Sequence, residues 1–451
     1  MSDSKLTSVL RPPGRGQQAT RTIAVVDIGT SKICCLIVEI DPSAARKQKF
    51  GQPLAGKMLG FGTQKSRGIK AGVVVDLAEA EEAIRAAVGR AERQSGVNVE
   101  DVILSVTCGR VKSVNFRANA KVATGFVKDD DIVRVLNAGR NFVEKDGRAL
   151  LHLHGLAYQL DGQAGLANPR GMTGETLSID LNAVTADEPA MRNLALLIER
   201  CYLNASGLFS TPYASGLAVI TEEEAELGVF VIDLGGGTTT VSVFAEKQFL
   251  YCDAIAVGGN HITYDIARWL STPLAEAERI KTLYGNLVGA VSDEHELVAY
   301  PVVGVGEAEL LHVTKADLGR TIRGRVEKTF EIVRQRLEQS GFQDYAGSRV
   351  VLTGGGSQLA GMLEFAQRHL DRQVRIGGPR PIAGMPGSLA GPQFATAVGL
   401  IHAELAPGAT PRSLDNSRPG QGGPGYLGKV GRWFRDSFWD DDEADAGARR
   451  A

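Results

Sequence analysis

The feature that most constrains the fold is a pattern that occurs twice in the chain. Residues 22–40 and residues 228–244 each contain an apolar run, an Asp, a turn rich in Gly, Ser or Thr, and a second apolar run with β-branched residues. Apolar runs of this length bounded by turn residues are typical of buried strands. Two copies of a strand–turn–strand unit indicate two similar α/β halves and not a solenoid, which needs at least three units.

Amphipathic segments follow each repeat and complete the α/β pattern. The first of them starts at an Asp and stops at a Gly, which are typical residues at the two ends of a helix. The helices predicted in this way cover residues 76–96, 128–143, 186–203, 258–271, 274–285 and 314–341.

Composition excludes several classes of protein. With 451 residues the chain is long enough for more than one domain, and 43% hydrophobic and 23% charged residues are ordinary for a globular protein. The net charge of −2 gives no reason to expect nucleic-acid binding. Five scattered cysteines predict neither a disulfide framework nor a zinc site. The tripeptide "HLH" at 152–154 lacks partners at metal-ligand spacing, so we interpret it as alternating strand residues.

The two ends of the chain have a different character. Residues 1–21 are polar and basic without an apolar core, so we expect a disordered leader and not a secretory signal. Residues 404–425 are rich in Pro and Gly and predict a flexible linker. No run of 18 or more apolar residues occurs.

Two short matches to phosphate-binding motifs do not have the required context. Residues 51–58 match the spacing of a P-loop, but Met58 stands where a Ser or Thr must reach Mg²⁺, and a strand-like segment follows instead of a helix. Residues 423–428 match G-x-G-x-x-G but follow a linker and not a strand.

Three other Gly-rich turns form a set, at residues 27–32, 233–240 and 352–358, and each follows an apolar strand. Without Cβ atoms in the way, the N–H groups of such turns can converge on phosphate oxygens. Asp27 and Asp233 end the first two strands, where they could hold Mg²⁺, most simply through its waters. One such turn alone is more often an ordinary β-turn, but three in this order favour a phosphate site.

These turns resemble the two phosphate loops and the adenosine motif of the actin, Hsp70 and sugar-kinase superfamily. Residues 211–220 and 394–401 resemble its two connecting helices. A closer resemblance is to the FtsA family of bacterial cell-division proteins, actin relatives, and it extends over about residues 22–440. It rests on residues 66–77, 199–203, 221–229, 274–285 and 373–379 and on the C-terminal tail.

The resemblance implies a two-lobed actin-like fold with duplicated RNase H-like cores and an inserted FtsA-specific subdomain. The expected parts are core I (22–107 and 186–225), the inserted subdomain (108–185), core II (226–261 and 346–403), an outer subdomain (262–345), the linker (404–425), an amphipathic helix (426–440) and an acidic end (441–451).

It also implies that ATP and Mg²⁺ bind between the lobes. The residues expected to face the nucleotide are Asp27, Gly29, Thr30, Ser31, Lys32, Asp233, Gly235, Gly236, Gly237, Thr238, Gly258, Gly259, Asn260, Glu278, Lys281, Gly354, Gly355, Gly356 and Gln358. Among them Glu278 and Lys281 would reach the ribose; the alternative is an exposed i, i+3 ion pair.

One departure from the superfamily bears on catalysis. Actin-like filament ATPases usually carry a Glu or Gln near the start of the first connecting helix, where it positions the attacking water. The comparable position here is near Thr211, and no carboxylate is present there. Because hydrolysis needs a positioned water, we expect tight ATP binding with slow or negligible turnover.

A second departure concerns the partner. In the family, a basic residue on the long helix of the outer subdomain contacts the acidic, apolar C-terminal peptide of FtsZ. The match here is Arg325, but Gly324 replaces the expected Pro. A solvated basic face is the alternative. The resemblance further implies self-assembly into filaments and contacts with other division proteins.

The tail has the pattern of an interfacial helix. Leu427, Val430, Trp433, Phe434 and Phe438 form an apolar stripe, flanked by Lys429, Arg432 and Arg435. About 14 residues span about 21 Å, too short for a bilayer but suitable for lying on an anionic membrane surface. Docking of this helix on the protein itself is the alternative.

Together these features predict an adapter that tethers FtsZ to the inner face of the cytoplasmic membrane at the division site. The alternatives are a small-molecule kinase or an Hsp70-like ATPase of the same superfamily. A kinase needs a catalytic base, and a chaperone needs a peptide-binding domain after the ATPase, for which only the linker and tail are available.

Overall fold

The first strand–turn–strand repeat forms the centre of a six-stranded sheet. β1 and β2 pair antiparallel, and the strand order is β11-β6-β1-β2-β3-β19. The structure is a computed structural model that describes residues 20–41, 51–52, 54–144, 148–166, 168–304, 310–342 and 349–406. The strands of this sheet are β1 (Arg21–Ile28), β2 (Lys32–Ile40), β3 (Leu54–Lys65), β6 (Asp101–Val106), β11 (Asn204–Ser210) and β19 (Ile382–Ala383).

The second repeat has the same place in a nine-stranded sheet of order β18-β17-β12-β13-β14-β7-β10-β8-β9. In both sheets the repeat's first strand has parallel neighbours on one side and antiparallel strands on the other, so the two predicted halves are confirmed. The strands are β7 (Lys112–Lys121), β8 (Arg148–Leu160), β9 (Gln163–Leu166), β10 (Thr176–Asp187), β12 (Val229–Leu234), β13 (Thr239–Ala245), β14 (Gln248–Ile255), β17 (Arg349–Thr353) and β18 (Gln373–Ile376).

The helices begin and end at the residues that favour helix ends. In α2 (Leu77–Ser95) the Asp76 side chain accepts from the Glu79 amide at 3.0 Å, and Gly96 closes the helix with φ 71°. The other helices are α3 (Asp129–Glu144), α4 (Glu188–Arg200), α5 (Thr211–Val219), α6 (Glu222–Leu227), α7 (Gly259–Leu270), α8 (Leu274–Tyr284), α9 (Lys315–Ser340), α10 (Met362–Leu370) and α11 (Ala395–Leu405). None of these described helices is both long and apolar enough to cross a membrane.

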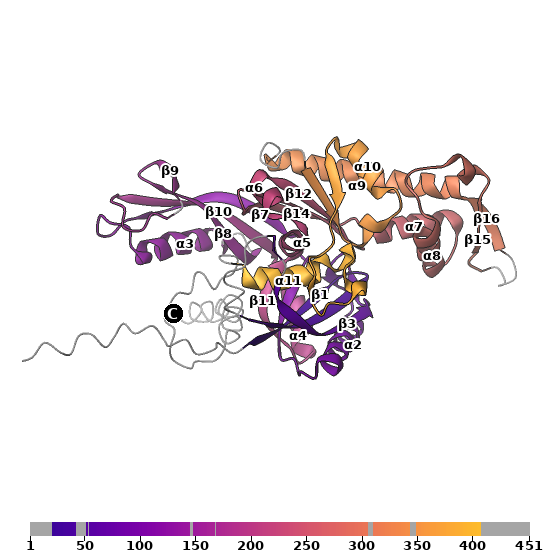
Figure 1. Cartoon of the computed structure of the whole chain (residues 1–451), viewed down its shortest axis with the longest axis horizontal. Helices are drawn as coiled ribbons and strands as arrows, with labels where there is room; N and C mark the ends of the chain where they lie inside the picture. The colour runs from indigo at the N-terminus through magenta and orange to yellow at the C-terminus, as the bar shows by residue number, and fades with distance from the viewer. Residues whose placement is uncertain are drawn as a thin grey trace, which may run out of the picture.

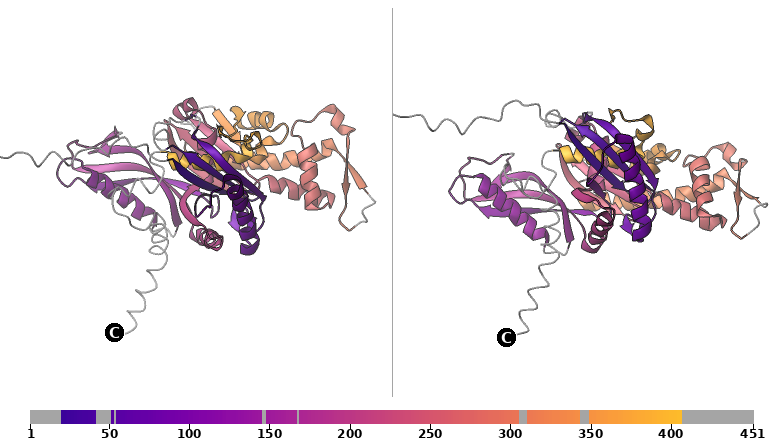
Figure 2. Two further views of the ribbon diagram at one scale, coloured as in Figure 1. Left: turned by 60° about the horizontal axis from the view of Figure 1, so that its bottom comes forward. Right: turned by 90° about the horizontal axis from the view of Figure 1, so that it is seen from below.

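The molecule is extended, with one subdomain at each end (Figures 1 and 2). At one end α3 covers β7, β10 and β8 and encloses its own hydrophobic cluster. At the other end lie α7, α8 and the hairpin of β15 (Leu297–Pro301) and β16 (Leu310–Thr314). The six-stranded sheet and strands β18, β17, β12, β13 and β14 of the nine-stranded sheet lie between the two ends. The two cores therefore form the middle of the molecule, and the two subdomains project from it in opposite directions (Figure 1).

Helices α5 and α11 join the two cores, and both are buried along their length. They cross so closely that a Cβ at Gly399 would come 1.8 Å from the Ala214 carbonyl oxygen. The second segment expected in core II (346–403) is in fact divided between the cores, because β19 pairs with β3 and α11 packs against β1. α11 also continues to Leu405, two residues into the expected linker.

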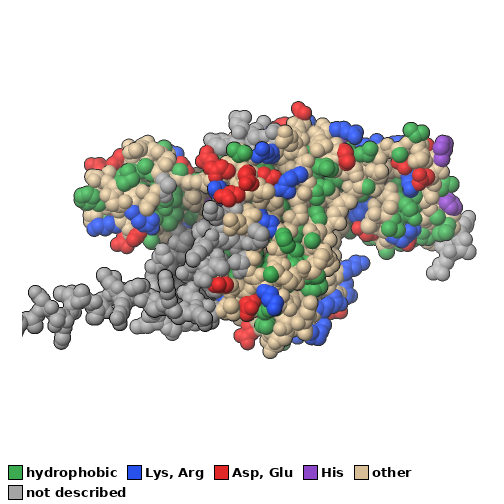
Figure 3. Space-filling view, in the orientation of Figure 1, with side chains coloured by type: hydrophobic (Ala, Val, Ile, Leu, Met, Phe, Trp, Pro, Cys, Tyr) green, Lys and Arg blue, Asp and Glu red, His purple; other side chains and the backbone are tan. Residues whose placement is uncertain are grey.

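Acidic side chains gather near the middle of the face shown in Figure 3. There α6 carries Glu222, Glu223 and Glu224 in its first turn. The positive end of the helix dipole stabilises negative side chains at this position. Glu224 also receives two hydrogen bonds from Arg375. This ion pair links the start of α6 to β18 of the second sheet.

Candidate functional site

A cavity of about 520 Å³ lies between the two cores, and all three Gly-rich turns line it. Of the residues expected to face the nucleotide, every one except Gly258 lines this cavity. A Cβ at Gly258 would come 2.6 Å from the Gly235 carbonyl oxygen, so Gly258 supports the second turn from behind. Segments distant in sequence therefore converge here.

The first turn is closed by a backbone hydrogen bond in which the Gly29 amide donates to the Lys32 carbonyl at 3.0 Å. A Cβ at Gly29 would come 2.7 Å from that oxygen, so a side chain there would open the turn. The Thr30 hydroxyl accepts from the Gly72 amide at 3.1 Å. That bond holds the turn against the small hairpin of β4 (Ile69–Lys70) and β5 (Val73–Val74).

The second turn repeats this geometry, since the Gly235 amide donates to the Thr238 carbonyl at 2.9 Å. It faces the first turn directly. A Cβ at Gly236 would come 2.0 Å from Ser31 Oγ, and one at Gly237 would come 2.5 Å from Thr30 Oγ1. Glycine at both positions lets the two turns approach each other without a side chain between them.

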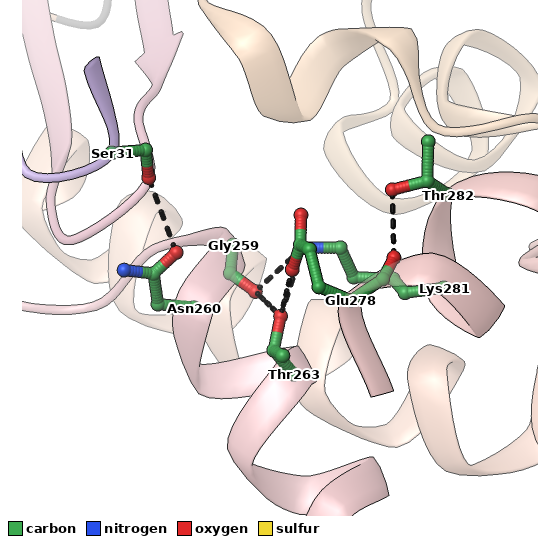
Figure 4. A network of polar contacts seen from close by, with 7 residues as sticks. All are labelled: Ser31, Gly259, Asn260, Thr263, Glu278, Lys281 and Thr282. Atoms are coloured by element: carbon green, nitrogen blue, oxygen red, sulfur yellow. Dashed lines mark hydrogen bonds and ion pairs between the residues drawn. The ribbon is translucent and has the colours of Figure 1, made fainter. Parts of the chain in front are cut away.

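The start of α7 stabilises this arrangement (Figure 4). The Gly259 and Asn260 amides donate to the Gly235 and Gly236 carbonyls at 2.9 and 2.7 Å. Ser31, which belongs to the first turn, donates from Oγ to Asn260 Oδ1 at 3.2 Å. Asn260 therefore contacts both turns.

The third turn depends most clearly on glycine. Gly354 has φ +81°, a conformation that other residues rarely adopt. A Cβ there would come 2.2 Å from Asp233 Oδ1 and 2.7 Å from the Leu234 carbonyl oxygen. Gly354 thus allows the third turn to pack directly on the carboxylate that ends β12.

Asp27 and Asp233 are the two buried carboxylates of the site. Asp27 accepts from the Ser105 hydroxyl at 2.8 Å, and Asp233 accepts from the Thr396 hydroxyl at 3.3 Å. Burial raises the pKa of both carboxyls, and together with the nearby charge of Asp27 it raises the pKa of Asp233 to about 6. Such a pair is well suited to a cation, which would offset the desolvation of both groups.

Lys32 lines the same cavity and lies close enough to Asp27 and Asp233 for both charges to act on it. Its ammonium donates to the Gln393 carbonyl and lies 3.6 Å from the centroid of the Phe394 ring. Burial lowers the pKa of Lys32, and the charges of Asp27 and Asp233 oppose this change. The lysine therefore joins the first turn to the segment that precedes α11.

Glu278 and Lys281 form part of a larger network than an exposed i, i+3 pair (Figure 4). Lys281 Nζ lies 2.6 Å from Glu278 Oε2 and also donates to Thr263 Oγ1 at 3.0 Å and the Gly259 carbonyl at 3.3 Å. The Thr263 hydroxyl donates to the same Glu278 oxygen. The network attaches α8 to the start of α7 at the edge of the cavity.

Several threonines of the site carry no signal in the sequence. Thr107 and Thr211 line the cavity and their hydroxyls are hydrogen-bonded to each other, and Thr240 also lines it. Gly72, Gln393 and Thr396 also line the cavity and were not predicted as binding residues. A single threonine at the end of a strand or helix looks like many others, so only the fold identifies these positions.

Arg325 lies outside the cavity, on α9. Its Nε and Nη2 atoms donate to the two oxygens of Asp265 on α7 at 2.5 and 2.8 Å. The hydrogen bond to Asp265 raises the pKa of Arg325. Both side chains remain about 30% exposed, so the pair is accessible at the surface. The predicted residues of the tail, 426–440, lie outside the described residues.

Comparison with protein families gives two matches. The family model described as "Cell division protein FtsA" matches residues 230–399, and the one described as "SHS2 domain inserted in FTSA" matches residues 108–185. The second match has the same bounds as the inserted subdomain predicted from the sequence.

Curated relatives align over most of the chain. The cell division protein FtsA of Rhizobium meliloti is 39% identical over 421 residues, which are 93% of this chain and 95% of that protein. The same protein of Neisseria meningitidis is 34% identical, over 94% and 100% of the two chains. That of Escherichia coli K12 is 29% identical, over 85% and 90%.

Two solved structures share the fold. A chain of the PilM–PilN type IV pilus biogenesis complex superposes with a TM-score of 0.59 at 17% identity, covering 85% of this chain and 99% of that one. MreB5 of Spiroplasma citri bound to ADP gives 0.51 at 13% identity, covering 85% and 96%. The fold is therefore the actin-like ATPase fold, with an inserted SHS2 domain.

Proposed function

Because the chain belongs to the FtsA family of cell-division proteins, we propose that it binds ATP and Mg²⁺ in the central cleft, assembles into filaments and tethers FtsZ to the membrane. The observation that carries the proposal is the convergence of three glycine turns, two buried carboxylates and Lys32 on one cavity. We expect the chain to act as a peripheral protein on the cytoplasmic face of the inner membrane at the division site, where it recruits other division proteins.

The cavity suits a nucleoside triphosphate. Its volume of about 520 Å³ lies within the usual range for small-molecule sites, about 300–1,000 Å³. In a turn without Cβ atoms, a phosphate can come close to the backbone and accept hydrogen bonds from its N–H groups. MreB5 of Spiroplasma citri, which shares the fold, was solved with ADP.

The carboxylates suit Mg²⁺, which prefers oxygen ligands and usually keeps several waters. Asp27 and Asp233 are oriented by the Ser105 and Thr396 hydroxyls, so their remaining oxygens are available to waters of the ion. When bound, the ion would neutralise part of the phosphate charge. Lys32 would then exchange its contact with the Gln393 carbonyl for a phosphate oxygen.

We expect Mg²⁺-dependent ATP affinity to rise from pH 5 to pH 7. Below a pKa of about 6 the Asp233 carboxyl holds a proton and cannot support the ion, so affinity falls by about tenfold per pH unit. Isothermal titration with a non-hydrolysable ATP analogue and Mg²⁺ at several pH values measures this. The nucleotide's own phosphate also has a pKa of about 6. Asp233→Asn is measured as the reference, because its affinity changes with pH only through the phosphate and not through residue 233.

The same shift has an opposite consequence for the free protein. Between the ordinary value of 3.8 and about 6, folded Asp233 retains a proton that the unfolded chain has released, so stability falls as the pH rises through this window. Asp233→Asn removes that loss. A wild-type pH profile identical to that of Asp233→Asn would contradict the role of this carboxyl.

Turnover of the bound ATP should be slow. The start of α5 places Thr211 at the cavity, and its hydroxyl is already bonded to Thr107. Residues 211–219 contain no carboxylate that could orient an attacking water. This favours ATP as a ligand that controls assembly over the kinase alternative, which needs an efficient base.

For the partner site we expect Arg325→Glu to weaken binding of the acidic FtsZ C-terminal peptide by about 10–150-fold, which corresponds to the loss of one charge-assisted hydrogen bond of roughly 1.5–3 kcal/mol. In the free protein Asp265 occupies the guanidinium, so the peptide carboxylate would compete with it. Fluorescence anisotropy with the labelled peptide measures the affinity. Arg320→Glu is the control, since Arg320 lies on the same helix and is more exposed; equal affinity of Arg325→Glu and wild type would exclude Arg325.

Sedimentation tests the proposed function as a whole. The full chain is centrifuged with and without ATP and Mg²⁺, each with and without anionic liposomes and FtsZ. We expect the protein to pellet with nucleotide, most completely with liposomes, and to bring FtsZ with it. A protein that stays in the supernatant under all conditions, while transferring phosphate to a small molecule, would be the kinase alternative.

A further inference from the structure

The two histidines of the "HLH" tripeptide lie on β8 of the inserted subdomain, where the sequence predicts alternating strand residues. Both are buried, and His152 has no exposed surface. The His152 ring lies 5.2 Å from that of Tyr213 on α5, and the His154 ring lies 5.1 Å from that of Phe249 on β14. This histidine cluster therefore lies where the inserted subdomain meets both cores.

A directed chain of hydrogen bonds runs through the cluster. The Ser210 amide donates to His152 Nε2 at 3.3 Å, and Ser210 Oγ lies 2.9 Å from the same nitrogen. Because a backbone N–H can only donate, Nε2 is the unprotonated nitrogen and the ring proton is on Nδ1. Nδ1 lies 2.6 Å from His154 Nε2 and donates to it. Burial lowers the pKa of both histidines, which keeps both rings neutral as this chain requires.

Ser210 connects this chain to the cavity. It immediately precedes α5, yet its hydroxyl does not cap that helix, although serine is a preferred capping residue; the hydroxyl is directed to His152 instead. The next residue, Thr211, lines the cavity. One turn further on, the buried Ser215 lowers the pKa of Asp233 and so lies close to this carboxylate. The first turn of α5 thus contacts the cavity on one side and the inserted subdomain on the other.

The inserted subdomain is also attached to the second core, by different groups. Only one ladder pair, Lys112 with Asp253, joins β7 to β14. Side chains complete the attachment: Asn182 Nδ2 donates to the Leu250 carbonyl at 2.7 Å, and the Cys252 amide donates to Ser113 Oγ at 2.8 Å. The subdomain is therefore held at two points, α5 of core I and β14 of core II. Any relative movement of the two cores must change its environment.

We propose that the hydrogen bond between the Ser210 hydroxyl and His152 Nε2 couples nucleotide occupancy of the cleft to the inserted subdomain. Nucleotide between the two cores changes the position of α5 relative to β14, and His152 transmits that change to β8 and β10. His152 is then a positioning residue that acts through Ser210 and touches no nucleotide. This inference rests on the proposed binding of ATP, and it assigns to the inserted subdomain a conformation that reports the nucleotide state.

Hydrogen–deuterium exchange of the full chain tests the coupling. A saturating non-hydrolysable ATP analogue with Mg²⁺ should slow exchange in residues 148–160 and 176–187 by about fivefold or more. Fivefold is the lower limit of the effect that one site typically has on another in allosteric proteins. Ser210→Ala and His152→Phe should each reduce the change to less than about twofold, and the double variant should add nothing, because both act through one bond. His402→Phe is the matched control: this buried histidine on α11 belongs to another part of core I and should leave the fivefold change intact.

The affinity for the analogue is measured on the same samples, so the two proposals fail separately. Nucleotide binding without a change in these strands overturns the coupling alone, as does a full response in Ser210→Ala. Ser210→Ala removes one oxygen and retains the backbone N–H, so it serves if His152→Phe does not fold. Absence of nucleotide binding in the wild type overturns the proposed function and the coupling together.

Discussion

Replacing Gly354 by alanine is expected to reduce the affinity for ATP and Mg²⁺ by about 10–100-fold, the range seen when groups that support a metal site are displaced. The new Cβ would come 2.2 Å from Asp233 Oδ1 and 2.7 Å from the Leu234 carbonyl oxygen. Either the Asp233 carboxylate must move or the third turn must open. In both cases Asp233 and the third turn, which are expected to hold Mg²⁺ and the adenosine, move apart. Equilibrium binding of a fluorescent ATP analogue measures the loss.

A matched control separates this contact from the strain of the backbone. Gly125 has φ +75°, close to the +81° of Gly354, but a Cβ there has nothing within 4 Å. Gly125→Ala should therefore lose only the stability that the left-handed backbone conformation costs, roughly 1–2 kcal/mol, and bind nucleotide as tightly as the wild type. If a folded Gly354→Ala protein binds nucleotide as well as Gly125→Ala does, the third turn is not part of the site.

The second large effect concerns the membrane. A chain that ends at Gly425 should bind anionic liposomes at least about 100-fold more weakly than the full chain, because each of Lys429, Arg432 and Arg435 contributes roughly 1 kcal/mol near an anionic surface. Loss of the apolar stripe, including Trp433, adds to this. Flotation of the protein with liposomes measures the bound fraction.

A shorter truncation is the control for this experiment. A chain that ends at Asp440 retains the predicted helix and lacks the acidic end, so it should bind liposomes at least as tightly as the full chain. ATP and Mg²⁺ should strengthen binding of the full chain, because many tails on one filament act at a high effective concentration. Undiminished flotation of the chain that ends at Gly425 would show that another surface binds lipid.

The parts of the fold that the sequence predicts are those encoded by neighbouring residues. Asp76 and Gly96 end α2 as expected, because a cap is made within one turn of the chain. The two repeats predict two similar sheets, because each contains a whole strand–turn–strand unit. The three glycine turns were identified for the same reason, since each turn's geometry depends on a few consecutive residues.

Contacts between distant segments were not predictable in the same way. From the sequence, residues 382–403 were assigned to core II, but β19 pairs with β3 and α11 packs on β1. These contacts depend on strands β1 and β3 of the first sheet, which are formed by residues more than 300 positions earlier in the chain. Arg325 reads as a basic residue on a helix face, and its partner Asp265 lies 60 residues away. Likewise nothing near residue 152 indicates that its ring meets Ser210.

The sequence by itself determined the elements, the duplicated halves and the residue types that could hold a triphosphate, because strand pattern, helix capping and glycine turns depend on local backbone energetics. Only the tertiary structure decided that the three turns share one cavity, that Thr107 and Thr211 pair where a carboxylate would be needed, and that His152 reaches the start of α5. Those contacts join surfaces of separate elements, and they exist only after the two cores have packed against each other.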